Sequence, residues 1–392
     1  MEDSWYSLSL VVYFEIYKSI QVVGAGGLII ILTVSASAHC QRVVYGAVAI
    51  GETTLNSVRV DSWPSDCPPR ELKLAGHDAR WHNSICRGLS NRGYLLTHSS
   101  SENGTGLLPL VFVKGQLFGK SPVSLPYINT GGVWAGNAGV ASELIDAACN
   151  LADELNVKYL ELRHEQAVEH PRLNFARTDK VHMRLALPET DEELNKSFKS
   201  KLRSQIKKSG SYGATVHFGR QELLAEFYNV FAHNMRDLGT PVFSVRLFRE
   251  ILNAFEDDAE LCVVRNESQA VAGGLLIHSD GVSEVASASS LREFNRTGAN
   301  MWMYRHLLRR AIERGSHTFD FGRSGEDSGT YKFKAQWGAV PSPATWQYYV
   351  RQGDPNDMRP DADGKKRLVE LWTKLPVSLT RIIGPPIVRG IP

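Results

Sequence analysis

Hydrophobic and polar residues alternate in a way that predicts the same order of elements twice along the chain. Two apolar runs in the first half, Tyr94–His98 and Gly106–Val113, are joined by a polar turn, which is typical of a hairpin. A helical spacing of apolar residues follows over Val140–Leu155, and Asn156 ends it before the strand-like run Lys158–Leu162. The first half is therefore predicted to form a hairpin, a loop, a helix and a strand.

The second half repeats this order. Its strand-like runs are Leu261–Arg265, Val271–His278, Val282–Ser289 and His317–Phe321, and its helical pattern is Asn300–Arg314. Three more helical patterns precede these runs, at Asp191–Ser209, Gln221–Leu238 and Val245–Phe255. The repetition predicts a mixed α/β fold built from two similar units.

Breaks in the pattern divide the chain into four segments. Pro188 follows a strand-like run and precedes residues that can cap a helix, so it separates a first domain, 53–187, from a second, 188–350. Residues 351–392 begin as a linker rich in Pro, Asp and Gly and continue as a tail in which basic and apolar residues alternate. Such a tail either contacts a membrane surface or docks on its own domain, and docking is the more common outcome.

Residues 1–52 form an atypical apolar extension. Lys, Arg, Asp and Glu are absent from Ser19 to Gln41, a run that is nearly long enough to span a bilayer. Acidic residues before this run argue against a signal peptide. A membrane anchor and a start upstream of the native protein are the other interpretations. We favour the second, because the resemblance described below begins near Arg59.

Composition narrows the classes of function. With 392 residues, of which 43% are hydrophobic and 22% charged, the chain can bury the cores of two domains. A formal net charge of +2 does not indicate DNA binding, so any recognition of an anion has to be local. The five cysteines form no CxxC pair and the twelve histidines no HExxH motif, which predicts reduced thiols and no metal site.

The segment from His317 to Gly338 joins a short apolar strand to a polar, glycine-rich loop. Side chains alternate along a strand, so Asp320 points away from the buried face of Phe319 and Phe321. The loop then supplies cations and a phenol, namely Arg323, Tyr331, Lys332 and Lys334. On composition alone this segment is either a site or an ordinary strand end with a solvated loop.

Two further segments have the chemistry to bind an anion. In the helical pattern after Pro188, Lys199, Arg203 and Lys207 share one face, and a phosphate would relieve their repulsion. A solvated helix face is the alternative. The loop before the second-half helix is predicted to form a helix N-terminus, where unpaired backbone N–H groups can bind a phosphate. An ordinary helix start without a ligand is the alternative. The residues of this loop are Asn295, Arg296, Thr297, Gly298 and Ala299.

A loop in the first half is shaped by prolines and paired glycines. It runs from Leu117 to Val133 and contains Asn129. Arg163 lies at the end of the next strand-like run, where its guanidinium could bind a carboxylate or phosphate. A structural salt bridge with Glu161 or Glu165 is the alternative.

Several of these segments resemble one family. The motifs DFGRS, GTYKFK and WG near Asp320, KSKLRSQIKKS in the basic helix, SLPYINTGGV around Asn129 and ELR at Arg163 are similar to those of FemAB-like acyltransferases. The branch they resemble is associated with exopolysaccharide and PEP-CTERM/exosortase systems and carries a BioF2-like acetyltransferase domain. The resemblance extends from about Arg59 to Arg389. It implies two domains of the GNAT (Gcn5-related N-acetyltransferase) fold.

The resemblance also implies a function. It predicts an N-acyltransferase that moves an acyl or aminoacyl group to an amine of a cell-envelope saccharide or peptide precursor. The donor would be an acyl-CoA, an acyl carrier or an aminoacyl-tRNA, with tRNA entering only as that donor and no cofactor held tightly. The expected place is the cytoplasm, including the inner face of the cytoplasmic membrane. A non-catalytic scaffold protein of a polysaccharide assembly system is the alternative.

Roles follow for the candidate residues. Asp320 is the candidate base, with Arg323, Tyr331 and Lys332 stabilising charge or positioning the amine; a purely structural Asp320–Arg323 pair is the alternative. The donor-binding candidates are Asn295, Arg296, Thr297, Gly298, Ala299 and Lys334, although Asn295 departs from the family's pyrophosphate loop. The acceptor- or anion-binding candidates are Lys199, Arg203, Lys207, Asn129 and Arg163. We expect the basic helix, the glycine loop and Asp320 to meet at one cleft.

Overall fold

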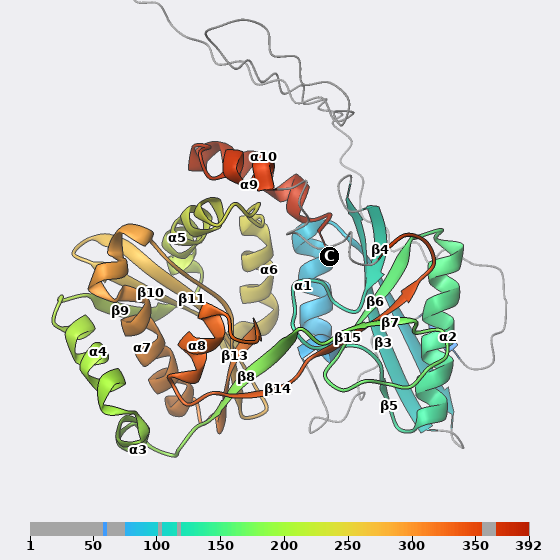
Figure 1. The fold of residues 1–392 in the computed structure, drawn as a ribbon, viewed down its shortest axis with the longest axis horizontal. Helices are drawn as coiled ribbons and strands as arrows, with labels where there is room; N and C mark the ends of the chain where they lie inside the picture. Colours follow the sequence, from blue (N-terminus) through green and yellow to red (C-terminus); the bar gives the residue numbers. More distant parts are fainter. Residues whose placement is uncertain (1–57, 61–74, 101–103, 116–118, 355–365, 392) are drawn as a thin grey trace, which may run out of the picture. The chain divides into compact units, whose positions relative to one another are not determined.

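The computed structural model describes residues 58–60, 75–100, 104–115, 119–354 and 366–391, and their strands form two sheets (Figure 1). The predicted N-terminal extension, 1–52, lies outside the described residues. Among the residues that are described, no helix is both long and apolar enough to cross a membrane.

The first sheet has the strand order β1-β2-β3-β4-β6-β15-β7, with β5 paired to β3. Its strands are β1 (Val58–Val60), β2 (Arg92–Ser100), β3 (Gly104–Gly115), β4 (Gly119–Val123), β5 (Trp134–Ala135), β6 (Tyr159–His164), β7 (Phe175–Arg177) and β15 (Thr345–Val350). Helix α2 (Ala138–Glu154) covers one face, where its Leu144 and Ile145 pack with Leu108 and Leu110 of β3 (Figure 1). Helix α1 (Ala79–Leu89) lies against the second half of the chain, through α6.

The second sheet has the order β14-β8-β13-β12-β11-β10-β9. Its strands are β8 (Lys180–Ala186), β9 (Thr215–Gly219), β10 (Ala259–Asn266), β11 (Gln269–Ser279), β12 (Val282–Ser290), β13 (Thr318–Gly325) and β14 (Val340–Pro343). The helices around it are α3 (Asp191–Ser197), α4 (Ser200–Gly210), α5 (Leu224–Asp237), α6 (Val245–Phe255), α7 (Ala299–Glu313) and α8 (Gly329–Ala335).

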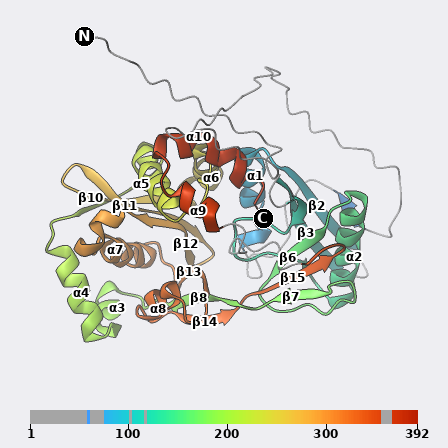
Figure 2. The same ribbon diagram turned by 45° about the horizontal axis from the view of Figure 1, so that its top comes forward.

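Two separate cores cover the faces of the second sheet. On one face Leu202 of α4 and Leu307 of α7 pack with Phe319 of β13. On the other face Phe227 of α5 and Phe248 of α6 pack with side chains of β10 and β11 and with α1. Figures 1 and 2 show α4 and α7 on the face opposite to α5 and α6. A side chain of β12 or β13 therefore faces either the α4/α7 helices or the α5/α6 helices, depending on its position in the alternation.

The predicted mixed α/β fold with a repeated order of elements is confirmed. The first half has the hairpin β2–β3, then α2 and β6, and the second has β10–β11–β12, then α7 and β13. One helical pattern, 191–209, is broken into α3 and α4, because Phe198 adopts an extended backbone and buries its ring against Trp337. The loop expected after Gly325 contains helix α8, which Ser328 caps by accepting a hydrogen bond from the Tyr331 amide.

Strand pairing crosses the boundary predicted at Pro188. Strand β8 precedes this proline but pairs with β13 and β14 in the second sheet. Strand β15 lies within the predicted second domain, 188–350, but pairs with β6 and β7 in the first sheet. The alternation in β8 explains its place, because Met183 and Leu185 are buried in the core under α4 and α7. The two sheets thus exchange one strand each.

The basic tail docks on its own chain. Its helices are α9 (Lys366–Trp372) and α10 (Val377–Val388), and α10 packs on α5 (Figure 2). Gly384 lies so close to Val242 that a Cβ at this position would be 2.9 Å from the Val242 nitrogen. The hydroxyl of Tyr127 donates a hydrogen bond to the Val388 carbonyl at 2.9 Å. Contact of this tail with a membrane stays a prediction.

Candidate active site

A row of charged side chains crosses the second sheet. Glu284 of β12 is the register partner of Asp320 of β13, and Asp320 is the register partner of Arg184 of β8. These positions alternate with Phe319, which lies in the core under α7, so the row faces the other side of the sheet. Residues far apart in the sequence are therefore neighbours, because three strands pair in this register.

Asp320 is hydrogen-bonded through both of its oxygens. Its Oδ2 accepts from Arg184 Nε at 2.8 Å, and its Oδ1 accepts from the Gly322 amide at 2.7 Å. The terminal nitrogens of Arg184 bind Glu165, with Nη1 at 3.1 Å from Oε2. The ion-pair partner of Asp320 is thus Arg184, and the Asp320–Arg323 pair considered from the sequence is wrong, because β8 brings a nearer arginine across the sheet.

Glu284 lines a small apolar cavity. The cavity has a volume of about 80 Å³, and its walls include Trp81 of α1, Phe248 of α6 and Asn129. Burial and then the nearby Asp320 carboxylate raise the pKa of Glu284 to about 7. Asn129 Nδ2 lies 3.5 Å from Glu284 Oε1, at the limit of a hydrogen bond. The cavity therefore contains a carboxyl group that exchanges its proton near neutral pH.

Strands β12 and β13 separate just beyond Glu284. They pair only from Val282 to Glu284, although β12 continues to Ser290. A register shift opposite β11 leaves Ala286 without a partner, which bends β12 at this point. Among the described residues, no strand pairs with the edge of β12 that faces β13 after Glu284. An unpaired strand edge of this kind can hydrogen-bond an extended ligand.

The glycine loop lies at the start of α7, as predicted. Gly298 precedes α7 with a φ of +71°, and its neighbour Ala299 is buried as the first helical residue. Thr297 Oγ1 donates to the Phe294 carbonyl at 2.8 Å, so this hydroxyl is used within the loop. A Cβ on Gly298 would lie 2.2 Å from Ser209 Oγ at the end of α4. Donor binding by Asn295, Arg296, Thr297, Gly298 and Ala299 stays a prediction.

We expect Gly298→Ala to destabilise the protein through two effects, the strained backbone conformation and a close contact of the new methyl group with Ser209. A left-handed conformation costs a residue with a side chain about 1–2 kcal/mol, and the new methyl group would also displace Ser209. Gly315→Ala is a matched control, because Gly315 has a φ of +73° and nothing within 4 Å of its added Cβ. Chemical denaturation of both variants measures the difference. Equal losses would show that the close contact with Ser209 contributes nothing.

The basic helix does not share a cleft with Asp320. Lys199, Arg203 and Lys207 are exposed on α4, which covers the face of the second sheet opposite to Asp320. Arg203 Nη1 donates to the Phe198 carbonyl at 2.7 Å. The end of α4 does meet the glycine loop, but the expected convergence of all three segments is wrong, because alternation along β13 separates Asp320 from the α4 face. Anion binding by these three residues stays a prediction.

The three candidates on α8 have different surroundings. Lys334 is buried, and its Nζ donates to the carbonyls of Gly322 at 3.1 Å and Arg323 at 3.0 Å. Burial lowers the pKa of Lys334 to about 8. These contacts attach α8 to β13. Tyr331 packs at the margin of the α4/α7 core and Lys332 is exposed, so their catalytic roles, like donor binding by Lys334, stay predictions.

Arg163 forms a salt bridge with Glu161, which the sequence analysis gave as the alternative to ligand binding. Its Nε lies 2.7 Å from Glu161 Oε1, and its Nη1 donates to the Ile128 carbonyl at 2.8 Å. Both side chains are buried. The bond to Ile128 holds the loop that carries Asn129 beside Glu284, which gives Arg163 a positioning role. Contact of Arg163 or Asn129 with an acceptor stays a prediction.

Glu284 and Arg184 were missed by the sequence analysis. A signal for Glu284 existed, because it lies between Ser283 and Val285 in a predicted strand, and alternation places it on the face opposite to Val285. Arg184 lies in the strand-like run before Pro188, whose pairing partner was not predicted. No sequence pattern relates it to Asp320, since their contact depends on the pairing of β8 with β13.

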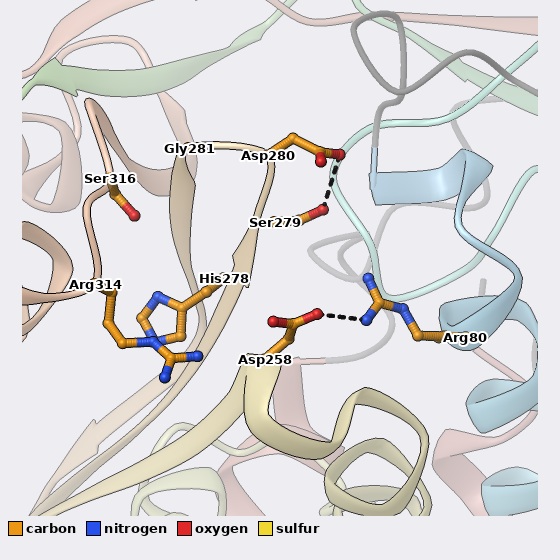
Figure 3. Close-up of a pocket in the computed structure, with 8 residues that line it drawn as sticks. All are labelled: Arg80, Asp258, His278, Ser279, Asp280, Gly281, Arg314 and Ser316. Atoms are coloured by element: carbon orange, nitrogen blue, oxygen red, sulfur yellow. Dashed lines mark hydrogen bonds and ion pairs between the residues drawn. The ribbon is translucent and has the colours of Figure 1, made fainter.

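A second cavity, of about 220 Å³, lies at the turn between β11 and β12 (Figure 3). Behind it, Ser316 bonds Ser283 at 2.7 Å, Ser283 bonds His278 at 2.7 Å, and His278 bonds Glu260 at 2.9 Å. Burial would raise the pKa of Glu260, but hydrogen bonds from His278 and Arg310 lower it to about 2. This chain of bonds is complete in itself and crosslinks the hairpin, and none of the predicted site residues lines this cavity.

Comparison with known proteins identifies the second half. Residues 196–335 match the family model described as acetyltransferase (GNAT) domain. This stretch is a GNAT-type acetyltransferase domain. Both Glu284 and Asp320 lie within it, as do the diverging strands β12 and β13 and the start of α7. No curated protein sequence matches the chain significantly.

Solved structures are similar to this chain over most of its length. FemX is similar with a TM-score of 0.52 and 16% identity, over 76% of this chain and 94% of that one. L-PGS from Bacillus licheniformis is similar with a TM-score of 0.47 and 15% identity, over 78% and 97%. A tandem GNAT protein from the clavulanic acid biosynthesis pathway is similar with a TM-score of 0.42 and 10% identity, over 72% and 90%. The predicted tandem GNAT-like fold is confirmed.

Proposed function

We propose that this protein is an N-acyltransferase that moves an acyl or aminoacyl group to an amine of a cell-envelope saccharide or peptide precursor. The single observation that carries the proposal is Glu284, a carboxyl group with a pKa of about 7 at a cavity where two strands of a GNAT domain diverge. A general base works best when its pKa lies near the working pH. The residues that resemble FemAB-like proteins support the choice of acceptor.

The reaction would use these groups as follows. The amine nitrogen attacks the donor carbonyl, a C–N bond forms, and the C–S or C–O bond of the activated ester breaks. Glu284 takes the proton that the nitrogen loses, and the thiolate or alkoxide of the donor leaves and receives this proton in turn from Glu284. The unpaired edge of β12 can bind the extended donor and hydrogen-bond the oxyanion that forms. We prefer Glu284 to Asp320 as the base, because both oxygens of Asp320 already accept hydrogen bonds.

The proposal also covers the class of acyl donor and the place of the protein in the cell. An acyl-CoA, an acyl carrier and an aminoacyl-tRNA are the donors considered, and the GNAT domain supports acyl-CoA as the first to test. Charge stabilisation by Arg323, Tyr331 and Lys332 belongs to the proposal as well. So do a place at the inner face of the cytoplasmic membrane and a role in exopolysaccharide systems of the PEP-CTERM type.

Mass spectrometry of the full chain with donors and acceptors tests this function. The protein is incubated with acyl-CoA, acyl-carrier or aminoacyl-tRNA donors and with amine-bearing envelope precursors. We expect an N-acylated product with one class of donor. The Glu284→Gln protein is the control, since it should retain the cavity but transfer far more slowly. A complete absence of product with all donors would favour the non-catalytic scaffold instead.

A further inference from the structure

A guanidinium group with an unused polar atom lies beside the candidate active site. Arg323 of β13 is half-buried, and its guanidinium lies 3.2 Å from the centre of the Trp346 ring. Its Nε is buried and has no hydrogen-bond partner among the described residues. The neighbouring arginines differ, because Arg163 pairs with Glu161, and Arg184 pairs with both Glu165 and Asp320. No ion pair between described residues compensates the charge of Arg323.

Two neighbouring strands, β8 and β14, also carry buried polar atoms without a hydrogen-bond partner among the described residues. His182 of β8 is the register partner of Arg323 on β13 and of Ser342 on β14. His182 is 0% exposed, and neither of its ring nitrogens has a hydrogen-bond partner among the described residues. The Oγ atom of Ser342 is also buried and has no such partner there. Leaving one buried polar group unpaired costs about 1–3 kcal/mol. Three adjacent strands thus present hydrogen-bonding groups that the described chain leaves unused.

A bulge in β13 places Arg323 in this row. The register shifts between Asp320 and Arg323, and Gly322 has a φ of +73°. Asp320 and Arg323 are an odd number of residues apart, yet they pair with Arg184 and His182, which lie on one face of β8. The bulge therefore brings the guanidinium to the same face as the carboxylates of the site.

Trp346 connects Arg323 to Glu284. Its indole contacts two guanidinium groups, because Arg163 also lies near it, at 3.9 Å from the ring centre. Its Nε1 donates to the Asn129 carbonyl at 3.4 Å, and the Asn129 side chain reaches Glu284 at 3.5 Å. A group bound at Arg323 would thus lie only two side chains away from the candidate base.

We propose that Arg323 binds a carboxylate of the acceptor, with His182 and Ser342 supplying further hydrogen-bonding groups at the same point of the sheet. A positive charge without a direct ion-pair partner can take up a negative one, and the planar guanidinium fork matches a carboxylate with two parallel hydrogen bonds. The inference rests on the proposed function and deepens it. The acceptor would carry a carboxylate as well as the amine, as an amino acid, a peptide or an acidic amino sugar does.

The charges around Arg323 support binding of an anion there. Burial and then the nearby Arg163 lower the pKa of Arg323 to about 9, although Glu161 and Asp179 act in the opposite direction. The pKa of Lys180 is lowered by burial and then by Arg323. A bound carboxylate would offset both effects, since an opposite charge favours the charged form of each cation. A phosphate would do the same, so it has to be distinguished by experiment.

Thermal unfolding of the full chain with small probes tests the site. The probes are N-acetylglycinate, its neutral analogue N-acetylglycinamide, and methyl phosphate, each titrated at constant ionic strength. We expect N-acetylglycinate to raise the Tm of the wild-type protein saturably, and N-acetylglycinamide to leave it unchanged. Arg323→Gln should weaken the apparent affinity at least about tenfold, the usual worth of a hydrogen bond to a charged group. Arg309→Gln, at an exposed arginine of α7, should behave as the wild type.

Arg323→Lys keeps the experiment decisive if Arg323→Gln folds poorly. It retains the charge but lacks the fork, so an intermediate affinity is expected. A wild-type Tm that does not respond to N-acetylglycinate would overturn the proposal, as would an equal response in Arg323→Gln. A response to methyl phosphate alone would replace the carboxylate by a phosphate. Binding does not require transfer, so carboxylate binding without any acylated product would sink the proposed function and leave this site standing.

Discussion

Glu284→Gln is expected to lower turnover by about two to four orders of magnitude, the usual contribution of a general base. Glutamine has nearly the size of glutamate and can still accept a hydrogen bond from Asn129, but it cannot take a proton from the amine. Donor binding should change little, because the edge of β12 and the start of α7 are untouched. Initial rates at saturating donor measure the loss.

The pH dependence of the wild-type rate follows from the same carboxyl group. Glu284 acts as a base only when deprotonated, and its pKa is raised to about 7 by burial and by Asp320. Transfer should therefore rise with pH up to about 7 and then level off. Stability should change in the opposite direction. Because the folded pKa is raised above the unfolded one, the folded state holds more protons in this window, and stability is lost as pH rises through 7.

These opposite trends supply the control. At pH 8 the Glu284→Gln protein should be at least as stable as the wild type, since it does not bury an ionised carboxylate. A loss of rate in a protein of equal or higher Tm cannot come from unfolding. Unchanged turnover in the folded variant would remove Glu284 from the mechanism and return Asp320 as the candidate base.

Arg184→Gln is expected to destabilise the protein by about 2–3 kcal/mol. Removing one partner of a buried ion pair typically costs about 3–5 kcal/mol, and we expect less here because 28% of the Arg184 side chain is exposed. The loss arises because the side chains of Asp320 and Glu165 would lose the cation between them. Denaturant titration near neutral pH gives the free energy of unfolding.

A double-mutant cycle with Asp320→Asn tests whether this pair is one unit. The double variant should be little worse than either single one, with a coupling of at least about 1 kcal/mol between the two sites. A parallel cycle of Asp320→Asn with Arg323→Gln should give a smaller coupling energy. Arg323 stacks on the Trp346 ring, and the arginine that hydrogen-bonds Asp320 is Arg184. Additive losses for Asp320 and Arg184 would contradict the pairing seen across β8 and β13.

Local patterns were enough to predict most elements of the fold. The helix α7, the hairpin β10–β11 and the strand β13 were predicted because their apolar spacing and their end signals are written in consecutive residues. The orientation of Asp320 away from the core followed from alternation alone. The position of Gly298 at a helix start was also predicted from its neighbours. Each of these properties depends on a few residues and on backbone geometry.

Only the tertiary structure decided the chemistry of the site. The strand-like run before Pro188 forms β8, and its pairing with β13, which was not predicted, supplies Arg184 to Asp320 and His182 to Arg323. The exchange of β8 and β15 between the sheets brings Trp346 beside both Arg163 and Arg323. The raised pKa of Glu284 depends on how deeply the folded chain buries it and on the distance to Asp320. Burial and strand register join residues far apart in the sequence, so neither can be read from the local pattern that encodes a helix or a strand.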